Sequence, residues 1–429
     1  MSSPDLRFFV QQADSLGWLD RVREPLSTNY QAARRIFDAG SRAVLLENLE
    51  GHRTPVLANI AATRPLLARA LDCSVEGLVR HVADAISTPG ELRVVTDAPF
   101  LANQHATPQL DSLVPLMRFY PRSERVYASA CVICARHPAF GMNLSYHRMM
   151  YLGGNRFAVR IVPRHLHQIL ELGGGQAEVA VVVGLHPAVG LAAAISFGPD
   201  FDEMACAASL LGQPLDVFDL DGLQVPAGAE MVWKARFTGE LADEGPFVDL
   251  TGTYDGIRQQ PVLEVQRLYH RDDYIYQVIL PGGSEHRILM GVPQEPRIFR
   301  IVQNTVAGLR DVVLSEGGCG WLHAVVSIDQ RAAGQGKNAG LAALAAHPSL
   351  KRVVVVDGDV DIHDPVAVEW AIATRVQPDR DLVIVGGAHG SSLDPSRDPR
   401  TETTSKWVID ATRPAGFDPQ DFSVVEPPR

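Results

Sequence analysis

Residues 125–136 read RVYASACVICAR, and residues 261–280 read PVLEVQRLYHRDDYIYQVIL. Both stretches are rich in β-branched and aromatic residues, and turn-forming Gly, Pro and Asn residues separate such stretches from one another. Similar short runs recur between about residues 96 and 300, namely RFAVRIVP (156–163), EVAVVVGL (178–185) and AEMVWKARFTGEL (229–241). Runs of this composition and spacing predict an antiparallel β-barrel or sandwich, interrupted by helices after Pro163 and around 202–211.

The flanking regions have the texture of α/β structure. Before residue 96, an amphipathic helix precedes the apolar strand AVLLENL (43–49) and a further helix around LLARALDC (66–73). After residue 300, helices alternate with apolar strands, which predicts βαβ units on a mostly parallel sheet. We therefore expect an α+β multidomain chain with domains over 1–95, 96–300 and 301–429. Its polar last forty residues are expected to be a tail that wraps a neighbouring surface or ligand, or is disordered.

Composition narrows the class of protein. The 429 residues carry a formal charge of −11, which disfavours nucleic acid as a partner because phosphate contacts require a basic face. No apolar run approaches the roughly 18 residues that a membrane span requires. Five cysteines, an odd number in a long chain, favour reduced thiols. We expect a cytoplasmic protein without a membrane segment, in which a local cation attracts any anionic substrate.

The peptide EGPFVD (244–249) is the strongest candidate for a chemical site. It sets Glu244 and Asp249 around a Gly-Pro turn, and Arg148 lies upstream in GMNLSYHR (141–148) among apolar neighbours. Two carboxyl groups in different environments can divide acid and base roles, and a guanidinium can hold a carboxylate on two nitrogens. A solvated acidic turn and a surface ion pair are the alternatives.

Asn143, His165 and Glu203 form a possible metal-binding trio. An amide oxygen, an imidazole and a carboxylate suit a divalent ion such as Mn²⁺ or Mg²⁺. Their separations carry no local metal signature, so helix capping and first-turn roles remain open for them.

Three other features have ordinary interpretations. Cys131 and Cys134, followed by His137, resemble half a zinc site, but the alternation of YASACVICA favours core thiols on a strand. The acidic run from Asp357 to Asp364 follows a strand and misses the calcium-loop spacing. Lys406 could meet a phosphate or simply be solvated.

Taken in order, these residues resemble the UbiD family of reversible decarboxylases, which use prenylated FMN. The shared motifs are Asn-x4-Arg, Pro-x-His, Asp-Glu and Glu-Gly-Pro-Phe-x-Asp, followed by VVVVDGDVDI (353–362) and SKWVIDAT (405–412). The resemblance covers nearly the whole chain. It implies a central split β-barrel like that of flavin reductases and a C-terminal domain that drives assembly into a homodimer or a dimer-based hexamer.

The resemblance also implies the ligands. Prenylated FMN would lie against a metal, usually Mn²⁺, held by Asn143, His165 and Glu203, with a K⁺ ion bound near Ala194 to Phe197. A prenyl-FMN-making transferase would supply the cofactor. The implied cofactor-binding residues are Asn143, Leu144, Ser145, Tyr146, His147, Arg148, Arg164, His165, Glu203 and Lys406.

By the same resemblance, Arg148, Glu244 and Asp249 would be the catalytic network that releases CO₂ from an aromatic, heteroaromatic or α,β-unsaturated carboxylic acid. We assign proton delivery to Asp249, and note that Val248 replaces a common glycine. His286, Met290 and Gln294 are expected to face the substrate, and their character favours a compact ring acid. An ordinary FMN-binding split-barrel oxidoreductase and a catalytically inactive oligomeric homologue are the alternatives.

Overall fold

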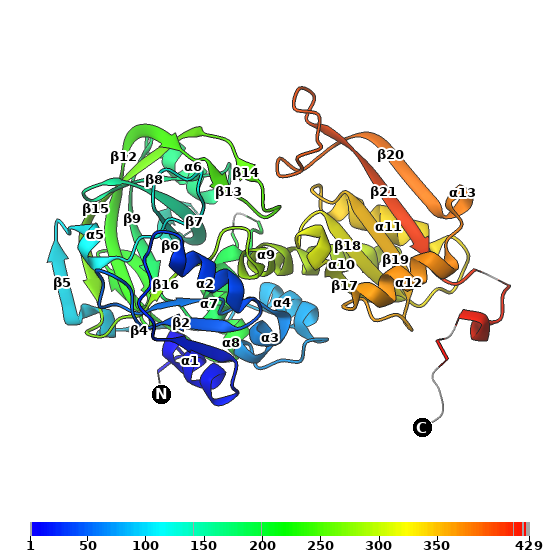
Figure 1. The fold of residues 1–429 in the computed structure, drawn as a ribbon, viewed down its shortest axis with the longest axis horizontal. Helices are drawn as coiled ribbons and strands as arrows, with labels where there is room; N and C mark the ends of the chain where they lie inside the picture. The colour runs from blue at the N-terminus through cyan, green and yellow to red at the C-terminus, as the bar shows by residue number, and fades with distance from the viewer. Residues whose placement is uncertain (1, 140, 199, 415, 423, 426–429) are drawn as a thin grey trace. The chain divides into compact units, whose positions relative to one another are not determined.

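The computed structural model describes residues 2–425 except 140, 199, 415 and 423, and the chain forms two compact units, Met1–Leu289 and Met290–Arg429 (Figure 1). Across these described residues, no helix combines the length and apolar character needed to cross a membrane.

A closed barrel of six antiparallel strands dominates the first unit. The strands run in the order β12-β9-β6-β7-β8-β15, and pairing of β12 with β15 closes the ring (Figure 1). This confirms the predicted antiparallel barrel. The strands are β6 (Tyr127–His137), β7 (Gly141–Gly153), β8 (Arg156–Val159), β9 (Gln176–Val183), β12 (Met231–Glu244) and β15 (Arg258–His270).

Alternation along the strands fills the barrel with side chains. Cys131 and Ile133 on β6 lie in one core cluster with Val181 on β9, the strand that pairs with β6. Trp233 is fully buried and stacks on Phe157, with ring centroids 5.7 Å apart. Residues with period two thus supply this core cluster, while most residues on the other face of β6 and β9 are buried as well.

Three helices lie against the barrel strands; the sequence predicted the first and the third of them but not the second. They are α6 (His165–Leu172), α7 (Pro187–Ala194) and α8 (Glu203–Leu211). Asp202 caps α8 by accepting a hydrogen bond from the Ala205 amide at 2.9 Å, so Glu203 enters the first turn. Both α7 and α8 are rich in alanine, which allows close packing on each other and on the strands.

A four-stranded sheet in the order β1-β2-β3-β16 forms the rest of the core of this unit. Strand β16 is Tyr276–Gln277, within the run 261–280 that the sequence assigned to the barrel. That part of the prediction was wrong: after β15 ends, these two residues pair with β3 instead. The elements are α1 (Leu6–Ser15), β1 (Leu19–Val22), α2 (Gln31–Ala39), β2 (Ala43–Leu46), β3 (Val56–Ala58), α3 (Arg64–Ala70) and α4 (Leu78–Ser87).

Shorter elements complete this unit. Strand β4 pairs in parallel with β10, and β5 adds to β15. Their bounds, with those of the remaining elements, are β4 (Leu92–Val95), β5 (Asn103–Ala106), α5 (Leu110–Leu113), β10 (Leu215–Leu220), β11 (Leu223–Pro226), β13 (Phe247–Val248), β14 (Tyr254–Asp255) and α9 (Ser284–Gly291).

The second unit is a five-stranded α/β sheet in the order β17-β18-β19-β21-β20. Strands β18, β19 and β21 are parallel, and antiparallel β17 and β20 form the edges. The predicted parallel pairing is confirmed for β18 and β19, whereas the predicted strand LVIVG (382–386), which begins β20, is antiparallel to its neighbour. The elements are α10 (Glu295–Thr305), β17 (Leu309–Leu314), β18 (His323–Ile328), α11 (Gln335–Ala346), β19 (Arg352–Asp357), α12 (Pro365–Arg375), α13 (Pro378–Asp381), β20 (Leu382–His389) and β21 (Thr403–Ala411).

Strand β21 corrects the prediction of a C-terminal tail. Residues 403–411 form an interior strand of the sheet, with Val408 fully buried opposite Val353. The short run WVIDA (407–411), apolar except for Asp410 and surrounded by polar residues, supplies most of the buried positions of the strand.

Candidate active site

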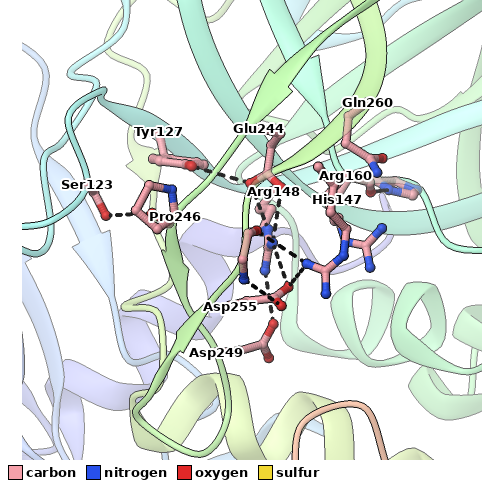
Figure 2. A network of polar contacts seen from close by, with 12 residues as sticks. Ser123, Tyr127, His147, Arg148, Arg160, Glu244, Pro246, Asp249, Asp255 and Gln260 are labelled. Atoms are coloured by element: carbon pink, nitrogen blue, oxygen red, sulfur yellow. Dashed lines mark hydrogen bonds and ion pairs between the residues drawn. The ribbon is translucent and has the colours of Figure 1, made fainter. Parts of the chain in front are cut away.

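Arg148 on β7 lies at the centre of a network of three carboxylates at the end of the barrel (Figure 2). Its Nε and Nη2 donate to the two oxygens of Glu244 at 3.0 and 3.1 Å, and its Nη1 donates to Asp249 at 2.9 Å. A third carboxylate, Asp255, accepts from Nη2 at 3.3 Å. The structure therefore brings together the arginine and both acids that the sequence singled out.

The last residue of β12, Glu244, is held most tightly. Its side chain is fully buried, and it accepts a further hydrogen bond from the Tyr127 hydroxyl at 3.3 Å. The ring of Phe247 lies 4.2 Å from the Arg148 guanidinium carbon, so the cation rests on an aromatic face. Burial, the two hydrogen bonds to Glu244 and the contact with the Phe247 ring together restrict the Arg148 guanidinium to one orientation.

A small hairpin places Asp249 and Asp255. Strands β13 and β14 pair with Phe247 opposite Asp255 and Val248 opposite Tyr254. The connecting turn is closed by hydrogen bonds from the Asp249 amide to the Thr253 carbonyl at 3.0 Å and from the Gly252 amide to the Asp249 carbonyl at 2.8 Å. The two acids thus stand at the two ends of one rigid turn, facing the same guanidinium.

The charges in this network are strongly coupled. Burial alone would lower the pKa of Arg148, but Glu244, Asp249 and Asp255 outweigh it, and the pKa is raised. Burial and the neighbouring Glu244 carboxylate raise the pKa of the Tyr127 hydroxyl, so Tyr127 remains a hydrogen-bond donor. Arg148 is a permanent cation in a nearly dry setting, where its interactions with carboxylates are strong.

Val248, the departure from glycine, is accommodated without disruption of the turn. Its side chain is 3 % exposed and packs against Gly282, where an added Cβ would lie 3.1 Å from Val248 Cγ1. The amide of Gly282 donates to Nδ1 of His286 at 3.1 Å. His286 and Asp249 interact electrostatically, which puts the imidazole near the acid turn; that His286 faces the substrate stays a prediction.

Two further polar groups border the network. His147 is buried, with Nδ1 against the Arg160 carbonyl and Nε2 against the Ser145 hydroxyl, each at 2.9 Å. Burial, together with the nearby charge of Arg164, lowers the pKa of His147 to about 4, so it is neutral. Arg160 continues β8 opposite Arg148, and its pKa is lowered by burial and by the charges of Arg258 and Arg148.

Asn143 and Glu203, two of the predicted metal ligands, are in direct contact. Asn143 Nδ2 donates to one Glu203 oxygen at 3.1 Å, and the Leu144 amide donates to the other at 3.0 Å. Glu203 is 2 % exposed, and burial raises its pKa to about 8. A buried carboxylate that meets only amide donors is suited to a cation, because a bound ion would compensate the charge.

His165, the third predicted ligand, begins α6. Among the contacts of the described residues, none joins it to Asn143 or Glu203. It interacts electrostatically with His137, which lies at the end of β6 opposite Gly141, two residues before Asn143. Metal binding by the trio remains a prediction. Within the described part of the chain, no three His, Cys, Asp or Glu side chains are grouped as a metal site, but that grouping does not count an asparagine.

The remaining candidate residues have structural roles in their own units. Cys131 and Cys134 are fully buried and free, and burial raises the pKa of both thiols, which confirms core thiols. Asp357 and Asp359 pair with buried Arg375.

Three candidates lie in the second unit. Lys406 lies there on β21 and donates to the Pro348 carbonyl. Met290 and Gln294 also belong to it.

Sequence reasoning missed Tyr127, Asp255, Arg160 and Arg258 as members of the network. The available signal for Asp255 was weak: an Asp-Gly pair shortly after the acid motif, which normally indicates only a turn.

Three family models together match most of the chain. Residues 10–86, 93–284 and 287–411 match the N-terminal, Rift-related and C-terminal domains of 3-octaprenyl-4-hydroxybenzoate carboxy-lyase, or UbiD. The chain is 44% identical to the anhydromevalonate phosphate decarboxylase of Methanothermobacter thermautotrophicus, over 92% of this chain and 93% of that protein. It is 48% identical to the enzyme of the same name from Methanocaldococcus jannaschii, over 70% and 72%.

Solved structures show the same architecture. The UbiD-class enzyme HmfF from Pelotomaculum thermopropionicum, in complex with FMN, superposes with a TM-score of 0.95 at 34% identity, over 99% of this chain and 98% of that one. An evolved dimeric form of HmfF in complex with prFMN gives a TM-score of 0.91 at 32% identity, over 99% and 97%.

Proposed function

The chain belongs to the UbiD family of carboxy-lyases, and on that premise we propose that it uses prenylated FMN to decarboxylate a small phosphorylated α,β-unsaturated acid of the anhydromevalonate phosphate type. Five relatives at 40–48% identity share the name anhydromevalonate phosphate decarboxylase. Their agreement favours this substrate over the compact ring acid expected from His286 and its neighbours.

The observation that carries the reaction class is the bridge that Arg148 makes between Glu244 and Asp249. Loss of CO₂ from an sp² carbon leaves a carbanion, and prenylated FMN, when bound, supplies the electron sink that no side chain provides. The protein must then hold the acid, exclude water and deliver one proton to carbon. A fixed guanidinium between two carboxylates, one buried and one accessible, suits this task.

Asp249 is the better placed of the two acids to give up the proton. Glu244 is fully buried, with both oxygens occupied by Arg148 and Tyr127. Asp249 is 16 % exposed and offers Oδ2 to Arg148 while Oδ1 accepts from the Leu250 amide at 2.8 Å. Glu244 would keep Arg148 charge-compensated and oriented while Asp249 exchanges its proton.

We propose that prenylated FMN is bound by the residues of this chain that match the family motifs. Asn143, His165 and Glu203 would hold Mn²⁺ against the cofactor phosphate, and the buried Glu203 carboxylate suits such an ion. A K⁺ ion near Ala194 to Phe197 belongs to the same proposal. The other proposed cofactor contacts are Leu144, Ser145, Tyr146, His147, Arg148, Arg164 and Lys406.

A cytoplasmic homodimer or dimer-based hexamer, loaded by a prenyl-FMN-making transferase, completes this assignment.

The test is to co-express the protein with such a transferase, purify it and measure CO₂ release from anhydromevalonate phosphate and from the same acid without its phosphate. We expect release from the phosphorylated acid, loss of release in Arg148→Gln, and normal release in Asp243→Asn. Asp243 is an exposed acid next to Glu244 in sequence, so its substitution shows whether loss of a charge outside the network also lowers release. Cofactor-loaded protein that releases no CO₂ from either acid would refute the proposed substrate.

A further inference from the structure

Asp255 bridges two arginines at the edge of the acid network. Its Oδ2 accepts from Arg148 Nη2 at 3.3 Å and from Arg258 Nη1 at 2.5 Å, and its Oδ1 accepts from the Gly256 amide at 2.9 Å. The side chain is 12 % exposed, less than Asp249 at 16 %. Asp255 contacts two arginines, whereas Asp249 contacts one, so Asp255 has the smaller freedom to move.

The hairpin explains why Asp255 reaches Arg148 at all. Pairing of Asp255 with Phe247 puts the carboxylate next to the ring on which the guanidinium rests. Asp249 approaches the same guanidinium from the other end of the turn, through Nη1 rather than Nη2. The two aspartates therefore hold different nitrogens of one cation.

The charge state of Asp255 differs from that expected of a proton donor. Burial by itself would raise its pKa, but the hydrogen bond from Arg258 and the charge of Arg148 outweigh burial and hold the pKa below the usual range. Asp255 is thus a permanent anion near neutral pH. When Asp249 carries a proton, Arg148 still has Glu244 and Asp255 as counter-charges.

We propose that Asp255 is a positioning residue that fixes Nη2 of Arg148 from the side opposite Asp249 and keeps the cation in place while Asp249 exchanges its proton. This inference rests on the proposed decarboxylase function. Without Asp255, Arg148 and Arg258 lose the carboxylate that they share, and the charge around Asp249 becomes more positive by one unit. The added positive charge favours the ionised form of Asp249. Proton delivery then fails at a lower pH than in the native protein.

The first test compares Asp255→Asn, Asp255→Glu and the control Asp243→Asn in the cofactor-loaded enzyme. Loss of one charge-assisted hydrogen bond lowers kcat by about tenfold in Asp255→Asn, with KM changed by less than about twofold. We also expect the alkaline limb of its pH–rate profile to move to lower pH. Asp255→Glu restores part of kcat, and Asp243→Asn behaves as native.

The second test does not depend on activity. Thermal unfolding of the cofactor-free protein is measured for Asp255→Asn, Arg148→Gln and the double variant, which forms a double-mutant cycle. We expect Asp255→Asn to lower the Tm in the native background but much less in the Arg148→Gln background. Asp243→Asn should lower the Tm equally, or not at all, in both.

The outcomes separate the two proposals. Native protein that shows no decarboxylation, together with strong Asp255–Arg148 coupling in the unfolding cycle, contradicts the proposed function but supports the contact. An active enzyme in which Asp255→Asn keeps the native kcat and pH profile, or in which the cycle shows no coupling, overturns the role of Asp255.

Discussion

Arg148→Lys separates the bridging geometry of Arg148 from its charge. The guanidinium makes four N–H···O contacts of 2.9–3.3 Å with three carboxylates, through three different nitrogens. A lysine ammonium keeps the charge but is a single point with three donors, and it cannot lie between three acids that surround a planar fork. We expect it to stay with one carboxylate and lose about half of the contacts.

The structure sets the size of the effect. Hydrogen bonds to charged groups contribute about 1.5–3 kcal/mol each, and the partners here are 0–16 % exposed, so solvent screens them little. Loss of two such contacts, with the charge retained, amounts to about 3 kcal/mol. Expressed as transition-state stabilisation, this is about a hundredfold in kcat, and expressed as stability of the first unit, Met1–Leu289, it is about 5 °C in Tm.

The assay is CO₂ release by cofactor-loaded protein, with Arg7→Lys as the matched control. Arg7 makes the same two-nitrogen fork on buried Glu230, at 2.8 and 2.9 Å, and also pairs with Asp273. Arg7→Lys should lower the Tm but leave kcat within about twofold, because that fork is not part of the acid network. If Arg148→Lys retained kcat within about threefold of native, charge alone would suffice and the bridging argument would fail.

Three shorter predictions follow from buried groups. Glu285 accepts amide hydrogen bonds from Asn59 and Ala61, and burial raises its pKa from 4.5 to about 7. The stability that protonated Glu285 contributes is therefore complete below pH 4.5 and is lost as the pH rises through 7, by about 3 kcal/mol. We expect Glu285→Gln to flatten the fall in Tm between pH 5 and 8. Glu203→Gln should abolish Mn²⁺ retention, measured by elemental analysis of purified protein, and chelation of native protein should stop CO₂ release until Mn²⁺ is restored. Gly190→Ala should destabilise the protein by about 1–3 kcal/mol in denaturant unfolding, because the new Cβ would lie 2.6 Å from the Tyr146 hydroxyl. Gly17→Ala is the control for backbone strain alone, because Gly17 has a positive φ but no other atom lies within 4 Å of an added Cβ.

The barrel could be predicted because its strands are rich in β-branched and aromatic residues and are separated by turn-forming residues. Burial itself does not alternate on β6 and β9, where most residues of both faces are buried, so composition rather than period identified these strands. Strand β16 has two residues and no period, and its pairing with β3 depends on where the chain emerges after β15. The interior strand β21 was taken for a tail because its short run WVIDA, which itself contains Asp410, lies between polar segments. Its partners, β19 and β20, are identified only by the sheet.

The site divides in a similar way. Arg148, Glu244 and Asp249 could be predicted together because an ordered set of motifs linked them, although 96 and 101 residues separate the arginine from its two acids. Asp255 and Tyr127 carry no motif. The place of Asp255 depends on the register of a hairpin whose strands have two residues each, and that of Tyr127 depends on where β6 comes close to Glu244. The composition of the sequence specifies neither.

Val248 shows how a departure from the motif can be absorbed by a neighbour rather than by the turn itself. A β-branched residue next to Asp249 would displace the acid turn if the segment packed against it carried a side chain there. That segment has Gly282 at this position, with φ +69°. The valine fills that space and is almost fully buried, while the amide of the same glycine holds His286 beside Asp249. Packing of Val248 therefore couples the acid turn to the start of α9, so enlarging residue 282 should disturb Asp249 and His286 together, whereas Val248→Gly should loosen the turn without removing any polar contact of Arg148.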